Sequence, residues 1–167
     1  GEYMVWTDDD VMVDADWLAA WARGIAAAPD CAVFGGRAIP VYEEPVQHWF
    51  AAGEKDLAAL LAIRDAGHWT VLDEKHVPYG LNYAIRTREQ RAHRYDPELG
   101  VAPGRRLGGE EVAVIRAILR EGGRGKWVWD ATVHHVIAPS RQSVSYVRHF
   151  YRANGYLFPL GGQRQGL

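Results

Sequence analysis

Short apolar runs alternate with amphipathic, helix-like segments along this chain of 167 residues, and this alternation constrains the fold more than any other feature. The expected strands are apolar runs bounded by turn residues, and they cover 2–7, 31–34, 37–39, 79–85, 126–129 and 131–137. The expected helices have apolar residues at three- and four-residue spacing, and they cover 15–28, 46–66, 87–93 and 110–121. Interleaved strands and helices are typical of α/β proteins, so we expect a mixed, mostly parallel sheet flanked by helices.

Glycine and proline residues divide the chain further. Gly35 and Gly36 predict a break or bulge after the second strand. Residues 96–109 are rich in both residue types, and a loop of that length in a compact domain is usually functional. We expect residues 1–139 to form the main domain and residues 140–167 to hold an amphipathic, aromatic-rich helix followed by a loose end.

Charge and cysteine content exclude some classes of function. The net charge is −2, with both signs spread along the chain, which argues against the basic stripe of a nucleic-acid-binding protein. Cys31 is the sole cysteine, so neither an intrachain disulfide nor a cysteine-based metal site is expected, and a reducing compartment is compatible. The sequence has no run of about 18 apolar residues that would span a membrane.

Three consecutive carboxylates, Asp8, Asp9 and Asp10, follow the first apolar run. In open α/β sheets, ligands bind beyond the carboxyl ends of the strands. Hard cations prefer carboxylate oxygens, and Mg²⁺ takes only one or two of them from protein when phosphate supplies others. The triplet therefore indicates a cation site, with a solvated turn as the alternative.

Two further motifs carry groups suited to chemistry. Glu110 and Glu111 follow Gly109 at an expected helix start, where glutamates are also favoured by the helix dipole alone. His134 and His135 lie in an expected strand, where a structural role is the alternative. Side chains alternate between the two faces of a strand, so only one of these histidines is expected to face a site.

The acidic triplet, the glutamate pair and the histidine pair follow one another along the chain, and with the segments around them they resemble the C-terminal half of a family 2 glycosyltransferase of GT-A fold. The resemblance covers about residues 3–155. The segments that carry the resemblance are Trp6–Val11, Asp14–Leu18, Phe34–Arg37, Pro78–Arg86, Tyr95–Gly100, Gly108–Glu111 and Ala131–His135. The resemblance implies a partial GT-A domain that begins at the Asp-x-Asp (DXD) motif, with the N-terminal nucleotide-binding strands missing. The missing strands are expected to leave an unpaired sheet edge beside residues 2–7, which read as a central strand.

The resemblance also implies roles for the acidic triplet and the histidines. Asp8 and Asp10 match the outer members of the Asp-x-Asp motif, with Asp10 as a direct metal ligand and Asp8 facing the ribose or the hydrated metal. Asp9 takes the variable middle position on the substrate side. His135 matches the later metal-ligand histidine, and His134 is the less favoured substrate-side choice.

Glu111 matches the catalytic base of the family, whose motif is usually Glu-Asp and here is Glu-Glu. Glu110 is then expected to contact the acceptor or the loop before it. Gly80 and Asn82 belong to a segment that resembles the wall of the donor-sugar pocket. Gly109 belongs to the loop that would position the acceptor.

The expected function is inverting, metal-dependent transfer of a sugar from a nucleotide-diphosphate sugar to an acceptor hydroxyl. The cofactor would be Mn²⁺ or Mg²⁺, the acceptor a glycan, lipid or polysaccharide, and nucleic acid is not an expected partner. A cytoplasmic location is expected, and contact of the tail helix with the inner face of the plasma membrane is left open beside a role in covering the sheet. The isolated segment is expected to bind nucleotide sugars weakly or not at all.

Two other functions stay open on the same residues. A metal-dependent phosphate or diphosphate hydrolase could use the same acidic and histidine groups. An inactive partial domain kept for protein contact would also fit, and its carboxylates would not converge on one site.

Overall fold

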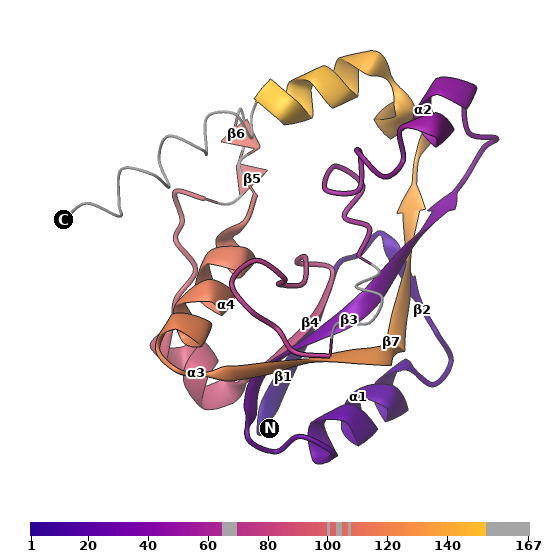
Figure 1. Ribbon diagram of the computed structural model, residues 1–167. Coiled ribbons are helices and arrows are strands. Elements are labelled where there is room, and N and C mark those ends of the chain that lie inside the picture. Colours follow the sequence, from indigo (N-terminus) through magenta and orange to yellow (C-terminus); the bar gives the residue numbers. More distant parts are fainter. Residues whose placement is uncertain (65–69, 100, 103–104, 107, 153–167) are drawn as a thin grey trace.

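A five-stranded mixed sheet forms the centre of the computed structural model (Figure 1), which describes residues 1–64, 70–99, 101–102, 105–106 and 108–152. The strand order is β1-β4-β3-β7-β2. These strands are β1 (Tyr3–Thr7), β2 (Val11–Val13), β3 (Cys31–Tyr42), β4 (Asn82–Arg86) and β7 (Arg124–Ile137). The α/β class expected from the sequence is confirmed, with helices on both sides of a mixed sheet.

The expectation of a mostly parallel sheet is wrong. Only β3 and β7 are parallel, whereas the pairs β1–β4, β3–β4 and β2–β7 are antiparallel. The alternation of strands and helices fixes the class of fold but not which strands become neighbours. Here α1 (Trp17–Ala26) connects β2 to β3, and β7 lies between those two strands, so the connection does not produce a parallel pair.

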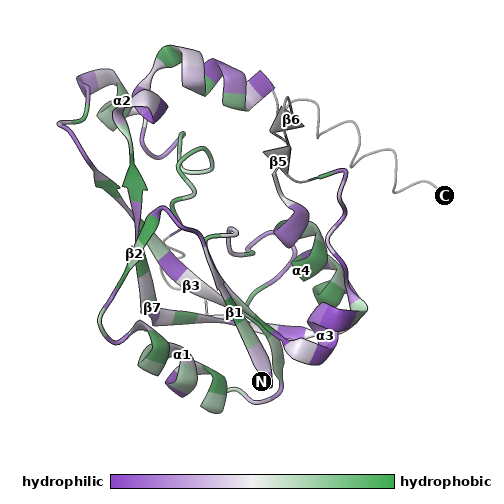
Figure 2. Ribbon diagram, turned by 180° about the vertical axis from the view of Figure 1, so that it is seen from behind, coloured by the Kyte–Doolittle hydropathy of each residue, from purple (hydrophilic) through white to green (hydrophobic). Residues whose placement is uncertain are grey.

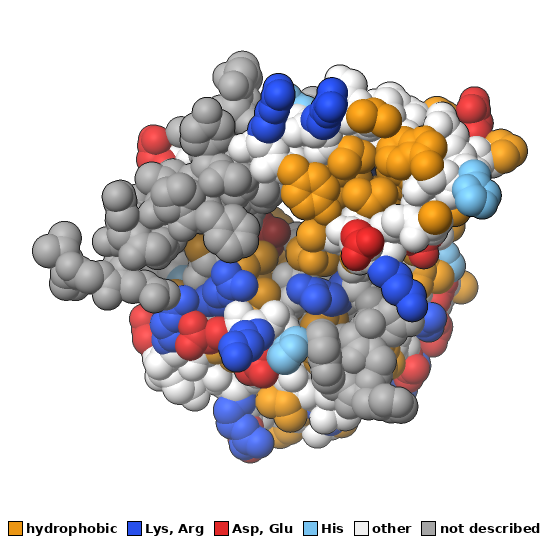
Figure 3. Space-filling view, turned by 45° about the horizontal axis from the view of Figure 1, so that its top comes forward, with side chains coloured by type: hydrophobic (Ala, Val, Ile, Leu, Met, Phe, Trp, Pro, Cys, Tyr) orange, Lys and Arg blue, Asp and Glu red, His pale blue; other side chains and the backbone are white. Residues whose placement is uncertain are grey.

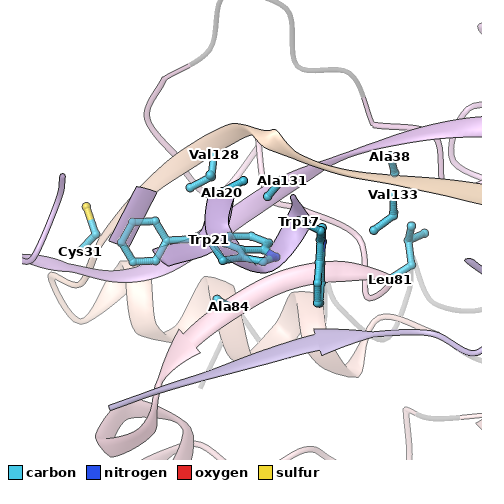
Figure 4. Close-up of a cluster of buried hydrophobic side chains, with 11 residues drawn as sticks. Trp17, Ala20, Trp21, Cys31, Ala38, Leu81, Ala84, Val128, Ala131 and Val133 are labelled. Carbon is cyan, nitrogen blue, oxygen red and sulfur yellow. The ribbon is translucent and has the colours of Figure 1, made fainter. Parts of the chain in front are cut away.

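Each face of the sheet is covered by one amphipathic helix. Phe34, Ala84 and Val128 pack with Trp17 and Trp21 of α1 in one buried cluster (Figure 4). Their neighbours Val33, Ile85 and Trp127 point the other way and pack with Ile115 and Ile118 of α4 (Glu110–Arg120). This alternation is the period of two expected for strands buried on both faces, and Figure 2 shows apolar residues along the strands and in both helices.

The ladder between β3 and β7 shifts register after Gly36, where the two-glycine sequence predicted a bulge. Gly36 pairs with Val128 but Arg37 pairs with Thr132, so β7 carries extra residues at 129–131. The expected strands at 126–129 and 131–137 are therefore one bulged strand. A Cβ on Gly36 would lie 2.2 Å from Asn82 Nδ2, so only glycine leaves room for that amide.

The buried side chain of Asn82 fills this bulge. Its Nδ2 donates hydrogen bonds to the carbonyl oxygens of Arg37 (2.8 Å) and Ala131 (2.7 Å), and its Oδ1 accepts one from Trp17 Nε1 (3.0 Å). The amide thus satisfies polar groups that the bulge would leave buried without partners. These contacts favour a structural role for Asn82, and the expected contact with a donor sugar stays a prediction.

Several elements differ from the sequence-based expectations. β1 is an edge strand, half-buried to exposed, and within the described part of the chain it pairs only with β4. The helix expected over 46–66 is reduced to α2 (His48–Ala52), which ends at Gly53 and is followed by turns. The other short elements are α3 (Thr87–Ala92), β5 (Val101–Ala102), β6 (Arg105–Arg106) and a 3₁₀ helix, η1 (Pro139–Gln142).

A last described helix over 144–152 packs on α2 and the turns after it. Tyr146, Val147 and Phe150 contact a buried cluster that contains Phe50 and Leu61. Figure 3 shows hydrophobic and basic side chains gathered on the face that carries this helix. In the described part of the chain, no helix is both long and apolar enough to cross a membrane. Contact with a membrane surface stays a prediction, as does the loose end, whose residues lie outside the described ranges.

Candidate active site

The acidic triplet connects β1 to β2, which lie at opposite edges of the sheet. Val11 of β2 pairs with His135 of β7, and the amide of Val136 donates a hydrogen bond to the carbonyl oxygen of Asp10 (3.0 Å). Strand pairing therefore brings together two residues that are far apart in the sequence. The expected partners Asp10 and His135 lie side by side for this reason.

The orientation of His135 leaves one ring nitrogen for a ligand. The ring is almost fully buried, and Nδ1 donates a hydrogen bond to the carbonyl oxygen of Leu61, which can only accept. In the neutral imidazole the lone pair is then on Nε2, which lies 3.5 Å from Oδ2 of Asp10. A backbone carbonyl that fixes the tautomer in this way is a common feature of metal-binding histidines.

Arg141, on η1, bridges the two groups. Its Nη2 donates to Oδ2 of Asp10 (2.6 Å), and its Nη1 donates to Nε2 of His135 (2.8 Å). The side chains of Arg141 and Asp10 are both about one third exposed, whereas that of His135 is 5% exposed. The sequence reasoning missed this arginine, because no local motif connects residue 141 to residue 10.

The residues present fit a divalent cation that takes the rest of its ligands from water and substrate. A carboxylate oxygen and an imidazole nitrogen suit Mn²⁺ and, through the carboxylate, Mg²⁺. Among the described residues, however, no group of three or more His, Cys, Asp and Glu side chains could hold an ion. The protein would therefore supply Asp10 and His135, and the expected role of Asp8 toward the metal stays a prediction.

Asp8 belongs to the same electrostatic environment. Partial loss of hydration raises the pKa of Asp8, although its side chain remains exposed, and the charge of Asp10 raises that pKa further. The positive charge of His135 would lower it, and the charges of Asp9 and Glu110 raise it. The acidic turn thus concentrates negative charge that a cation would relieve.

Glu111 lies in the first turn of α4, close enough to Asp8 for their charges to interact. Burial raises the pKa of Glu111, and the charges of Glu110 and Asp8 add to this effect. The backbone N–H groups of Glu111 itself and of Gly80 oppose it by hydrogen bonding to the carboxylate. A carboxylate with a raised pKa whose charge interacts with the acidic turn is a candidate general base.

Two glycines position Glu111. A Cβ on Gly80 would lie 3.1 Å from the Glu111 carboxyl carbon, so the missing side chain lets the carboxyl group lie against the backbone there. Gly109 precedes α4 with a φ of 99°, a conformation that L side chains rarely adopt. The expected contacts of Gly80 with the donor sugar and of Gly109 with the acceptor stay predictions.

Glu110 has a buried oxygen, Oε2, with no hydrogen-bond partner among the described residues. A buried carboxylate oxygen without a donor costs free energy, and a ligand hydroxyl group could satisfy it. The sequence predicted an acceptor contact for Glu110, and this unsatisfied atom agrees with that prediction without testing it.

An aromatic cluster lies beside the carboxylates and was not identified from the sequence. Trp6 stacks on Tyr83 with a centroid distance of 6.3 Å, and the hydroxyl groups of Tyr83 and Tyr95 are 2.8 Å apart. Burial raises the pKa of Tyr83, and the charges of Glu111 and Asp8 add to this. By contrast, Trp127 is buried in the core.

His134 lies on the opposite side of β7 from His135. Its Nε2 is 2.7 Å from Oδ1 of Asp14, so it forms a separate pair. The expectation that only one of the two histidines joins Asp10 agrees with this geometry. A substrate contact for His134 or for the exposed Asp9 stays a prediction.

The chain matches no protein-family model and no curated protein sequence.

Proposed function

We propose that this chain carries the catalytic residues of an inverting, metal-dependent glycosyltransferase of GT-A type. The observation that carries the proposal is the Asp10–His135 pair together with Asp8, whose charge interacts with both members of that pair and with Glu111. The donor would be a nucleotide-diphosphate sugar and the acceptor a hydroxyl group of a glycan, lipid or polysaccharide. A cytoplasmic site of action and contact with a membrane surface belong to the same proposal.

The proposed roles follow from the chemistry of each side chain. Glu111 accepts the proton of the acceptor hydroxyl as that oxygen attacks the anomeric carbon, and a raised pKa brings this carboxylate closer to the operating pH. Asp10 and His135 would hold a Mn²⁺ or Mg²⁺ ion, which supplies a counter-charge for the departing nucleoside diphosphate. Glu110 orients the acceptor through its unsatisfied oxygen.

An assay of donor breakdown separates this proposal from a hydrolase. The chain is incubated with millimolar UDP- and GDP-sugars and Mn²⁺, since high donor concentration offsets the weak affinity expected, and products are followed by NMR. We expect nucleoside diphosphate release that depends on Mn²⁺ and on an added sugar or lipid acceptor, with inversion at the anomeric carbon.

Release at the same rate with water alone would favour the metal-dependent hydrolase. Absence of release with all donors and with both cations would contradict the proposed activity and leave the inactive partial domain.

A further inference from the structure

Arg141 occupies the position at Nε2 of His135 where a metal ion would bind. The imidazole has one in-plane lone pair available, because the protonated Nδ1 donates a hydrogen bond to the Leu61 carbonyl group. That lone pair accepts a hydrogen bond from Arg141 Nη1 at 2.8 Å. A metal ion and the guanidinium group therefore cannot bind Nε2 at the same time.

The guanidinium group also binds the carboxylate of the pair. Oδ2 of Asp10 faces Nε2 of His135, and it accepts the short 2.6 Å bond from Arg141 Nη2. The guanidinium group thus binds both protein atoms that the cation would use, in one forked contact. It also neutralises the Asp10 carboxylate, which stands in a turn of like charges.

We propose that Arg141 is a built-in competitor for the cation, so that a divalent ion binds Asp10 and His135 only in exchange for the guanidinium group. This inference rests on the proposed metal site. Arg141 is a positioning residue: without a cation it holds the carboxylate oxygen and the imidazole lone pair facing each other. Because its side chain is 30% exposed, it can rotate into solvent without rearrangement of the core.

If the cation has to replace the Arg141 guanidinium group, the affinity of the chain for the cation should depend on Arg141. A cation that binds the wild-type chain must first displace a positively charged group that makes two charge-assisted hydrogen bonds, whereas Arg141→Gln has no such charge and can offer at most weaker hydrogen bonds. Removing the competitor should therefore tighten binding of Mn²⁺. We expect the dissociation constant to fall roughly tenfold to a hundredfold, the range that charge-assisted hydrogen bonds cover.

The test is a titration of the metal-free chain with Mn²⁺ alone, followed by electron paramagnetic resonance of the free ion. Arg148→Gln is the matched control, since Arg148 is exposed on the 144–152 helix and its loss changes the net charge equally. Arg141→Lys keeps the positive charge but cannot make the two-pronged contact, so its dissociation constant for Mn²⁺ should lie between those of the wild type and Arg141→Gln. If Arg141→Gln does not fold, the comparison of Arg141→Lys with the wild type tests the proposal. Nitrogen modulation of the Mn²⁺ signal should be lost in His135→Ala and kept in His134→Ala.

The outcomes distinguish the failure of the competition by Arg141 from the failure of the metal site itself. If the wild type binds Mn²⁺ through His135 but Arg141→Gln binds it equally or more weakly, competition by Arg141 is wrong and the metal site stands. If no variant shows nitrogen modulation that depends on His135, the metal site itself is wrong, and the competition fails with it.

Discussion

Asn82 gives the sharpest test of how the fold holds its candidate site in place. Replacing it by alanine removes one amide that serves three partners: the Trp17 indole N–H and the Ala131 carbonyl group, which are buried, and the Arg37 carbonyl group, which is partly buried. Each buried polar group left without a partner costs about 1–3 kcal/mol. The free energy of unfolding should therefore fall by at least about 3 kcal/mol, a large part of the roughly 5–15 kcal/mol that stabilises a domain.

The measurement is urea denaturation followed by tryptophan fluorescence, which reports on the seven tryptophans of the chain, Trp17 among them. With an m-value of about 1–3 kcal/mol/M, the unfolding midpoint of Asn82→Ala should shift down by about 1 M or more. Gln47→Ala, which truncates an exposed amide, is the control and should change stability by less than about 0.5 kcal/mol. If the midpoint for Asn82→Ala stays that close to wild type, the bulge does not depend on this amide.

A second variant of Asn82 tests the direction of its hydrogen bonds. Asn82→Asp keeps an acceptor for Trp17 but places an ionised oxygen against the two carbonyl groups that now accept from Nδ2. It should be less stable than wild type at pH 7 and recover in part at low pH, where the protonated carboxyl group can donate once. If Asn82→Asp is as stable as the wild type at both pH values, the assignment of Nδ2 as the donor to the two carbonyl groups is wrong.

Two further predictions concern Glu111 and Gly36. Because burial raises the folded-state pKa of Glu111 above its ordinary value of 4.5, the folded chain loses stability as pH rises from below 4.5 through the folded pKa. Glu111→Gln should therefore raise the thermal midpoint at pH 7 but not at pH 4, and an equal midpoint at pH 7 would argue against burial of the charge. Gly36→Ala puts a Cβ 2.2 Å from Asn82 Nδ2 and should cost about 1–3 kcal/mol or more in urea denaturation. The control Gly108→Ala has open space around its Cβ, and an equal effect of the two alanines would contradict the steric argument.

Local patterns predicted most of the elements that carry the site. The apolar run before the acidic triplet, the period of the helix that starts at Glu110 and the glycine pair at 35–36 correspond to β1, α4 and the register shift of β3. Each of these features is set by neighbours in the sequence. Alternation along β7 likewise separated His135 from His134.

Features that depend on pairing of distant segments could not be predicted. The antiparallel neighbours of β4 and β2 follow from how the connections cross the sheet, which no periodicity records. Asn82 was expected at a sugar pocket because its segment resembles one, but its side chain stabilises the bulge opposite Gly36. Arg141 meets Asp10 and His135 only because β2 pairs with β7 and η1 follows that strand.

The central claim is that Glu111, rather than its neighbour Glu110, accepts the proton of an acceptor hydroxyl beside the Asp10–His135 site. The direct measurement is the rate of sugar transfer at millimolar donor with Mn²⁺, compared between the isosteric variants Glu111→Gln and Glu110→Gln. The account predicts a loss of roughly 10²–10⁴-fold for Glu111→Gln, the usual contribution of a general base, and a smaller loss for Glu110→Gln, which removes an acceptor contact but no proton acceptor. An unchanged rate in Glu111→Gln, with its fold intact, would contradict the account.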